Sequence, residues 1–226
     1  MRSGLFYFKK AFTLAEVLIT LGIIGIVAAI TIPNLIANYQ KNVTVTKLQK
    51  AISILNQAYK LSFDDVGEPT FEEAYNMDSK TYFNTYWAPY MKILSTCDNY
   101  STRCGYKSNN PYTGAGKNRD FYPIHPKGTA FISFDGYFYS IRSAYNSDEP
   151  SGIILVDLNA SAPPNKYGKD VFFLTRVQRD GGGIRAYGYE KTNDEINNEC
   201  SKQSYGMYCA EKIRRAGWKI EKDYPW

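Results

Sequence analysis

The chain has 226 residues, which is enough for one large domain or two small ones, and 44% of them are hydrophobic. Its formal net charge of +5 gives no strong case for nucleic acid or an anionic lipid surface as the main partner. Histidine occurs once, at His125, so a zinc site with two histidines is excluded, and no Ser-His-Asp or Cys-His pattern surrounds it. We therefore expect no enzymatic activity.

The N-terminal segment combines a short basic leader with a long apolar stretch. Lys9 and Lys10 lie at the end of the leader, and no charged residue occurs from Val17 to Gln40. As a helix, this stretch would rise about 36 Å, which is enough to cross the core of a bilayer. The basic residues that precede it predict a single span with a cytoplasmic N-terminus and an exported C-terminal part.

Two ordinary kinds of N-terminal segment fit this sequence less well. A secretory signal peptide has a shorter apolar region that ends in small residues at a cleavage site, whereas this run continues through Pro33 into an amphipathic segment. A simple membrane anchor would not carry Glu16, because a carboxylate inside the membrane costs at least about 2.5 kcal/mol and by default marks a functional partner. The sequence therefore predicts a membrane helix whose acidic group has a role.

The sequence Lys-Lys-Ala-Phe-Thr-Leu-Ala-Glu over residues 9–16, followed by an apolar helix, resembles the leader and cleavage motif of type IV prepilins and type II secretion pseudopilins. The resemblance implies that a prepilin peptidase cuts between Ala11, where the family usually has Gly, and Phe12. Phe12 then becomes an N-methylated first residue, and residues 1–11 are a leader peptide. Glu16 matches the family's glutamate, and Pro33 matches its helix-kinking proline, which should bend or locally melt the helix.

The resemblance also implies a function. The mature chain would be a structural filament subunit, that is, a pilin, a minor pilin or a pseudopilin of a type IV pilus or a type II secretion filament. The alternative is a minor pilin that acts as an adhesin or a DNA-binding module on the same scaffold. In the packed filament, Glu16 of one subunit would neutralise the new amine of a neighbour, because paired charges are tolerated in lipid where single ones are not.

The implied partners and locations follow from this role. The partners are other pilin subunits in a helical filament, the prepilin peptidase and an inner-membrane assembly platform. The protein would begin in the inner membrane and end in a periplasmic or cell-surface filament. Loss of the leader removes three positive charges and leaves about +2, so nucleic acid is not an expected partner.

The helix is expected to continue past the membrane into a globular head. Residues 12–37 form the transmembrane or filament-core half, and residues 38–226 form a periplasmic or extracellular head. An amphipathic stripe, which would pack on the head, precedes a helix end near Ser62. The stripe consists of Leu48, Ile52, Leu55 and Tyr59.

The rest of the chain predicts an α+β fold with an antiparallel sheet of about four strands packed on the long helix. Residues 70–94 favour one or two short helices. Residues 129–134 and 137–142 flank Asp135-Gly136, which predicts a hairpin with a two-residue type I′ turn. That turn pairs Phe134 with Tyr137, Ile132 with Tyr139 and Ala130 with Ile141 on one apolar face. Further strands are predicted at 153–158, 171–178 and 184–190.

Four cysteines occur as two pairs that are close in sequence, Cys97 with Cys104 and Cys200 with Cys209. Neither pair has the C-x-x-C spacing of zinc or redox motifs. An even count outside such a pattern indicates disulfides and an oxidising compartment. Local pairing is the simplest of the three connectivities, and the alternative is four reduced, partly buried thiols.

One loop between two predicted strands is rich in oxygen-bearing side chains: Asp157, Asn159, Asn165 and Asp170. Calcium favours such loops, although the EF-hand pattern is absent. The loop resembles the Asp-x-Asn…Pro-Asn…Gly-x-Asp loop of many pilin-like proteins, some of which bind calcium in the head. A plain hydrogen-bonded turn is the other interpretation, and no further cofactor is expected.

Overall fold

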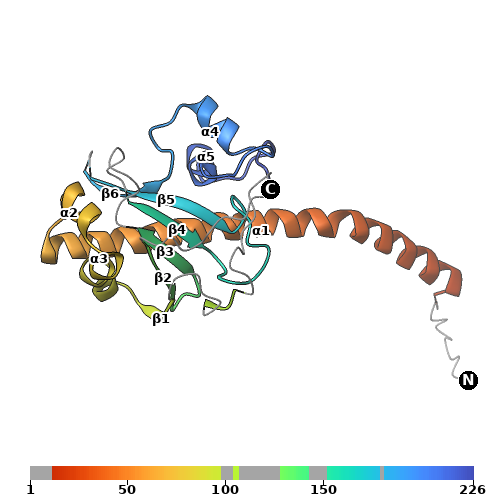
Figure 1. The fold of residues 1–226 in the computed structure, drawn as a ribbon. Coiled ribbons are helices and arrows are strands. Elements are labelled where there is room, and N and C mark those ends of the chain that lie inside the picture. The colour runs from red at the N-terminus through yellow and green to blue at the C-terminus, as the bar shows by residue number, and fades with distance from the viewer. Residues whose placement is uncertain (1–11, 98–103, 107–127, 143–151, 179–180) are drawn as a thin grey trace, which may run out of the picture. The chain divides into compact units, whose positions relative to one another are not determined.

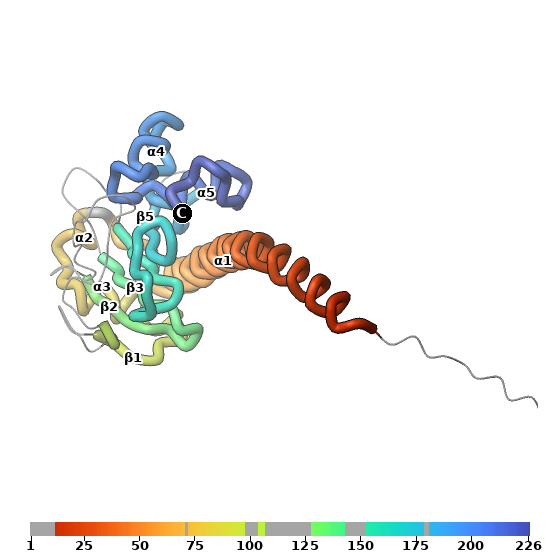
Figure 2. Tube along the Cα trace, turned by 90° about the vertical axis from the view of Figure 1, so that its right-hand side faces the viewer, coloured from red at the N-terminus to blue at the C-terminus, as the bar shows by residue number. Residues whose placement is uncertain are grey.

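The computed structural model describes residues 12–97, 104–106, 128–142, 152–178 and 181–226. The chain divides into two compact units, residues 1–41 and residues 42–226. One long helix, α1 (Leu14–Val66), runs through both of them. Its path is shown from red to orange in Figure 1, and Figure 2 shows the same trace from the side.

Helix α1 ends where the chain meets Gly67, which adopts a left-handed conformation with φ of 77°. Pro69 follows two residues later and cannot continue a helix. Pro33 lies inside the continuous helix α1. Of the two predicted effects, a bend or local melting, the second is therefore not seen in the structure.

Among its described residues, the second unit contains one antiparallel sheet of six strands in sequential order from β1 to β6. Its strands are β1 (Ile93–Cys97), β2 (Gly128–Ser133), β3 (Phe138–Arg142), β4 (Ile153–Asp157), β5 (Val171–Val177) and β6 (Gly183–Ala186). The prediction of about four strands was therefore too low, although the α+β class is confirmed. Strand β1 was missed because it is short and its middle three residues are exposed, so no alternating apolar pattern marks it.

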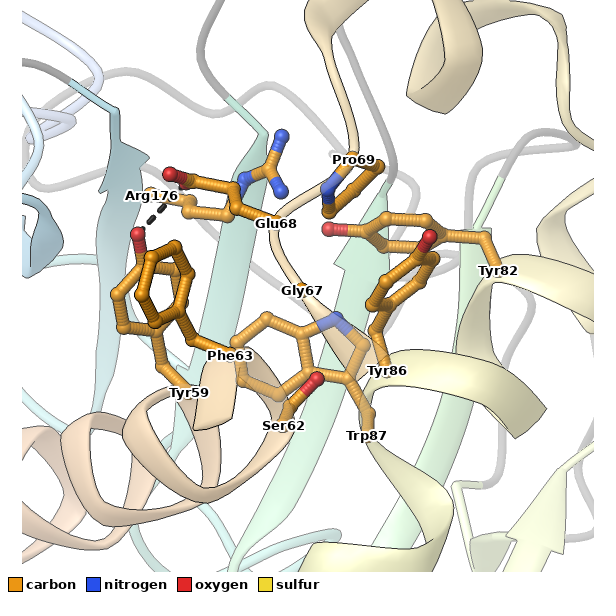
Figure 3. A pocket seen from close by; sticks show the side chains of 10 residues that line it. All are labelled: Tyr59, Ser62, Phe63, Gly67, Glu68, Pro69, Tyr82, Tyr86, Trp87 and Arg176. Atoms are coloured by element: carbon orange, nitrogen blue, oxygen red, sulfur yellow. Dashed lines mark hydrogen bonds between the residues drawn. The ribbon is translucent and has the colours of Figure 1, made fainter. Parts of the chain in front are cut away.

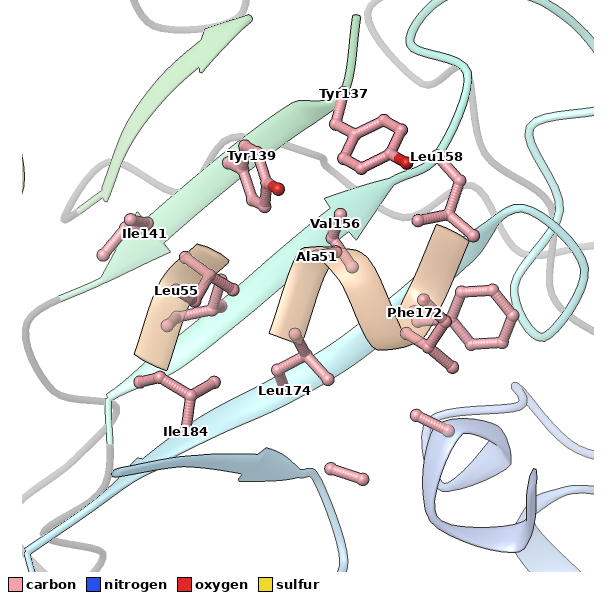
Figure 4. Close-up of a cluster of buried hydrophobic side chains, with 14 of the residues drawn as sticks. Ala51, Leu55, Tyr137, Tyr139, Ile141, Val156, Leu158, Phe172, Leu174 and Ile184 are labelled. Carbon is pink, nitrogen blue, oxygen red and sulfur yellow. The ribbon is translucent and has the colours of Figure 1, made fainter. Parts of the chain in front are cut away.

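The C-terminal half of α1 covers one face of this sheet. Figure 4 shows Ala51 and Leu55 of the helix above side chains from β3, β4 and β5, among them Tyr139, Val156 and Leu174. Leu48 and Leu55 of the predicted stripe are fully buried, while Ile52 and Tyr59 are partly buried against the same cluster. Packing of this stripe joins the helix to the sheet.

The hairpin between β2 and β3 has a register one residue away from the predicted one. Phe131 pairs with Tyr139 and Ile132 pairs with Phe138. The loop has three residues rather than two, because the Ser133 amide bonds to the Tyr137 carbonyl and Gly136 takes a left-handed φ of 79°. A slip of one residue exchanges the faces of a strand. Ala130 and Ile132 therefore pack on the sheet face away from the helix, and Phe134 is exposed.

Short helices complete the head. Helices α2 (Phe71–Asn76) and α3 (Ser79–Tyr86) and the 3-10 turn η1 (Ala88–Tyr90) lie in the region where short helices were predicted. Near the C-terminus, α4 (Asn193–Glu199) and α5 (Cys209–Arg215) follow the last strand. Ala210 and Ile213 of α5 are buried in the same core as the α1 stripe.

Candidate functional site

The candidate site is the start of α1, where Glu16 is held by its own chain. Glu16 Oε2 accepts hydrogen bonds from the backbone N–H and the hydroxyl of Thr13, both at 2.9 Å. In return, the Glu16 amide donates to Thr13 Oγ1 at 3.2 Å, and the Thr13 carbonyl accepts from the Val17 amide. This is a capping box, in which a threonine N-cap and a glutamate three residues later satisfy two free amides of the first turn.

Two further capping boxes in the head have the same geometry. Thr70 with Glu73 and Thr192 with Glu195 show the same reciprocal bonds, with glutamate-to-backbone distances of 2.8 Å in each. The prepilin-like motif is therefore also an ordinary helix-start signal. Sequence reasoning assigned an assembly role to Glu16 and did not recognise Thr13 as its partner, although the Thr-x-x-Glu spacing before an apolar run was visible.

The predicted cleavage site lies directly before this cap. Ala11 is outside the described residues, and Phe12 is 87% exposed. Phe12 adjoins Thr13, whose amide already donates to Glu16. A new amine on Phe12 would therefore adjoin the residue whose backbone N–H already bonds to Glu16.

The first unit exposes apolar side chains on all sides of the helix. Large side chains such as Leu18, Leu21 and Ile30 are between 60% and 65% exposed. By length and composition, α1 contains one stretch that could cross a membrane, and none of that stretch is buried within the structure. A helix that is apolar all round belongs in a membrane or in the core of an assembly. A Cβ atom added at Gly22 or Gly25 would meet no neighbour within 4 Å, so these positions are open to approach by another helix.

The structure contains both local disulfides. Cys97 at the end of β1 is bonded to Cys104, and Cys200 at the end of α4 is bonded to the first residue of α5, Cys209. The second disulfide lies in the main core, where both of its cysteines are fully buried. It fixes the C-terminal helix against the helix that precedes it.

The oxygen-rich loop brings its two carboxylates onto protein donors. Asp157 accepts from the Tyr106 hydroxyl at 2.8 Å and the Asn159 amide at 3.1 Å, and Asp170 accepts from the backbone amides of Asn165 and Lys166. Burial raises the pKa of Asp170, and these amide bonds oppose the effect.

The same loop also offers oxygens to a cation. Asn159 Oδ1 is buried without a hydrogen-bond partner in the described part of the chain. The Asn165 amide group lies against the carbonyls of Ala160 and Ala162 and bonds to both if its nitrogen faces them. With the Asn165 nitrogen facing the carbonyls, the turn is held by its own hydrogen bonds. With the amide turned over, the Asn165 oxygen would join the two carbonyl oxygens as a third ligand for a cation. Calcium binding here stays a prediction.

Comparison with known families supports the identification of the N-terminal segment. Residues 8–32 match the prokaryotic N-terminal methylation motif, and residues 34–111 match a family of unknown function (DUF6613). Searches of the curated proteins and of the solved structures found no match.

The long N-terminal helix on an antiparallel sheet, with an apolar and exposed first half, defines a pilin-like fold. The methylation motif at the start of that helix is prepilin-type and is typical of the type IV pilin and pseudopilin family.

Proposed function

We propose that the mature chain is a structural subunit, rather than an enzyme, of a type IV pilus or a type II secretion filament. The observation that carries the proposal is Glu16, which stands at the start of an exposed apolar helix, one turn from the predicted cut before Phe12. In this role the protein is a pilin, a minor pilin or a pseudopilin. It is inserted in the inner membrane with a cytoplasmic N-terminus until the filament takes it up.

The capping box explains how Glu16 is tolerated before assembly. Its carboxylate accepts two hydrogen bonds from Thr13 and lies in the first turn, where the helix dipole favours a negative charge. Cleavage by the prepilin peptidase then creates a positive amine at Phe12. In a bundle of α1 helices on the assembly platform, that amine pairs with Glu16 of an adjacent subunit. The pair favours the filament over the monomer because each charge alone is costly in lipid.

The proposal is tested first by the mass of the mature protein. In cells that contain the peptidase, the purified protein should begin with N-methylated Phe12 and lack residues 1–11. Retention of the leader in the assembled form would contradict the proposal.

The assembly step is tested by Glu16→Gln. Glutamine at this position still accepts from the Thr13 amide, so the cap is kept and only the charge is lost. We expect the yield of sheared filaments to fall at least about ten-fold, because the neighbour's amine loses its counter-ion, while membrane-bound protein persists at the native level. The matched control is Glu73→Gln, which makes the same change in a capping box of the head and should leave assembly unchanged. Native filament yield with Glu16→Gln would count against charge pairing.

A further inference from the structure

The loop between β4 and β5 is bound near both of its ends by side chains of α1. The Lys47 ammonium donates to the carbonyl of Leu158, the first residue after β4, at 3.3 Å. The Thr44 hydroxyl donates to the carbonyl of Lys169, two residues before β5 begins, at 3.4 Å. Thr44 and Lys47 are three positions apart, so they lie on the same face of the helix. Together they join the start and the end of the loop to α1.

The loop is also closed by contacts of its own residues. The Leu158 N–H donates to the Asp170 carbonyl at 2.9 Å, which joins the two ends of the loop to each other. The Leu158 side chain is buried in the main core, as Figure 4 shows. In the middle of the loop, Asn159 Nδ2 donates to the carbonyls of Ala162 and Pro163. Hydrogen bonds within the chain therefore hold the loop at its ends and in its middle.

The two carboxylates of this loop face different donors of the protein. Asp157 accepts through Oδ1 from the Asn159 amide at 3.1 Å and through Oδ2 from the Tyr106 hydroxyl at 2.8 Å. Asp170 accepts through its two oxygens from the backbone amides of residues 165–166, at 2.9 Å and 2.6 Å. All four carboxylate oxygens thus have a donor within the chain, and the two groups of donors lie at different ends of the loop sequence.

This arrangement does not match what a calcium ion requires. Calcium takes about six to eight oxygen ligands that converge on one point. The described residues contain no group of three or more carboxylate, histidine or cysteine side chains that could hold a metal ion. Asn159 Oδ1, which is buried without a partner among the described residues, would supply one ligand of that set. The Lys47 ammonium at the Leu158 carbonyl adds a positive charge that would repel a calcium ion from this end of the loop.

We propose that the β4–β5 loop is closed by protein donors alone and binds no structural calcium, with Thr44 and Lys47 as a clamp that holds it on α1. In this arrangement the Asn165 amide nitrogen faces the carbonyls of Ala160 and Ala162. The clamp takes the place of the calcium that some pilin-like proteins bind in the head. The inference concerns the head alone, so either it or the filament proposal can fail without the other.

The first test asks whether calcium stabilises the head. The full-length protein in detergent micelles is unfolded thermally in excess EDTA, in excess calcium chloride and in magnesium chloride at equal ionic strength. We expect the midpoints in EDTA and calcium to agree within about 1 °C, whereas an ion bound to the native state at a hundred times its Kd would raise the midpoint by about 5 °C or more. A rise of that size with calcium and not with magnesium would overturn the proposal.

The second test removes the clamp with the double variant Thr44→Val, Lys47→Met, which deletes both donors and keeps most of the side-chain volume. Deuterium exchange of single backbone amides is followed by NMR in micelles. We expect the amides of Leu158 and Asp170 to exchange at least about five-fold faster, relative to the amide of Leu174 in β5, because two bonds that close the loop are lost. Use of this ratio separates opening of the loop from a loss of overall stability.

The matched control is the double variant Thr46→Val, Lys60→Met, which makes the same two changes at exposed positions of α1 and should leave the ratio unchanged. Unchanged exchange in the clamp variant would overturn the role of Thr44 and Lys47. Slower exchange of the loop amides when calcium is added to the native protein would overturn the metal-free closure.

Discussion

At the scale of single residues, charged groups in apolar surroundings define this protein. Glu16 stands in an apolar helix and is held by Thr13, and Glu211 is fully buried between two arginines. Arg176 of β5 is buried in the pocket shown in Figure 3, and its Nε and Nη2 atoms have no hydrogen-bond partner among the described residues. A charge removed from water costs free energy unless a partner is provided. Each of these residues therefore indicates a binding partner, either within the chain or outside it.

Glu211 is held by two arginines of its own helix, Arg214 and Arg215. Arg214 binds it through two nitrogens, and Arg215 binds it through Nε at 2.7 Å. Arg215 also donates to the carbonyls of Tyr189 and Lys191 and to the side chain of Asn193. Arg215 thus links the Glu211 carboxylate of α5 to residues 189–193 at the start of α4.

We predict that Glu211→Gln lowers the free energy of unfolding by about 2 kcal/mol, because the buried amide nitrogen faces guanidinium donors and has no acceptor, while Arg214 and Arg215 are partly exposed and can be solvated. Urea unfolding followed by circular dichroism measures the change. Glu221→Gln, at an exposed position, is the control and should stay within about 0.5 kcal/mol of the native protein. Equal stability of the two variants would show that water replaces the carboxylate as the partner of Arg214 and Arg215.

At the scale of elements, α1 has two different surfaces along one helix. From Leu14 to Ile36 its large apolar side chains are exposed, whereas from Val45 to Ser62 one stripe is buried against the sheet. The small residues Ala51 and Ala58 on that stripe are buried to within 1%, which allows the helix backbone to approach the strands closely. The head is therefore stabilised by the second half of α1 and leaves the first half free for the membrane or a filament.

The contribution of the stripe is tested by Leu55→Ala. Leu55 is fully buried, so its removal should lower the free energy of unfolding of the head by about 3 kcal/mol through lost burial and an added cavity. Chemical unfolding in detergent, followed by far-ultraviolet circular dichroism, reports the loss. Leu61→Ala on the same helix is the matched control, because Leu61 is 54% exposed. A similar loss for both variants would contradict the assignment of the buried face.

At the scale of the whole molecule, an apolar helical unit and a disulfide-bonded head share one chain. The C-terminal segment closes the head, since α5 and Tyr224 are part of the same core as α1. The Tyr224 hydroxyl donates to the carbonyl of Gly168, in the loop that joins β4 to β5. The Cys200–Cys209 disulfide stabilises the segment that makes these contacts.

We predict that the double variant Cys200→Ala, Cys209→Ala lowers the free energy of unfolding by about 2.5 kcal/mol, the chain-entropy value for a short closed loop. Thermal and urea unfolding under non-reducing conditions measure it. Alkylation of the protein unfolded in urea without reductant should label none of its four cysteines. Labelling of Cys200 or Cys209 under these conditions would show that the bond does not form in the purified protein.

Features that depend on neighbouring residues could be read from the sequence. The methylation motif, the apolar helix and its stripe involve residues that are adjacent or one to three turns apart, so their spacing alone reveals them. The same applies to the α+β class and to both local cysteine pairs. The capping role of Thr13 was equally local, and its signal was present in the Thr-x-x-Glu pattern.

Features that depend on distant residues were decided by the tertiary structure. Strand β1 exists because its backbone pairs with β2, and the register of the β2–β3 hairpin was settled by a three-residue loop and by packing on both faces of the sheet. The pocket of Arg176 joins residues from α1, α3 and β5, and Tyr59 and Arg176 are 117 positions apart in the sequence. Such contacts follow from how the whole chain minimises exposed apolar surface and unpaired polar groups, and no short window of sequence contains that information.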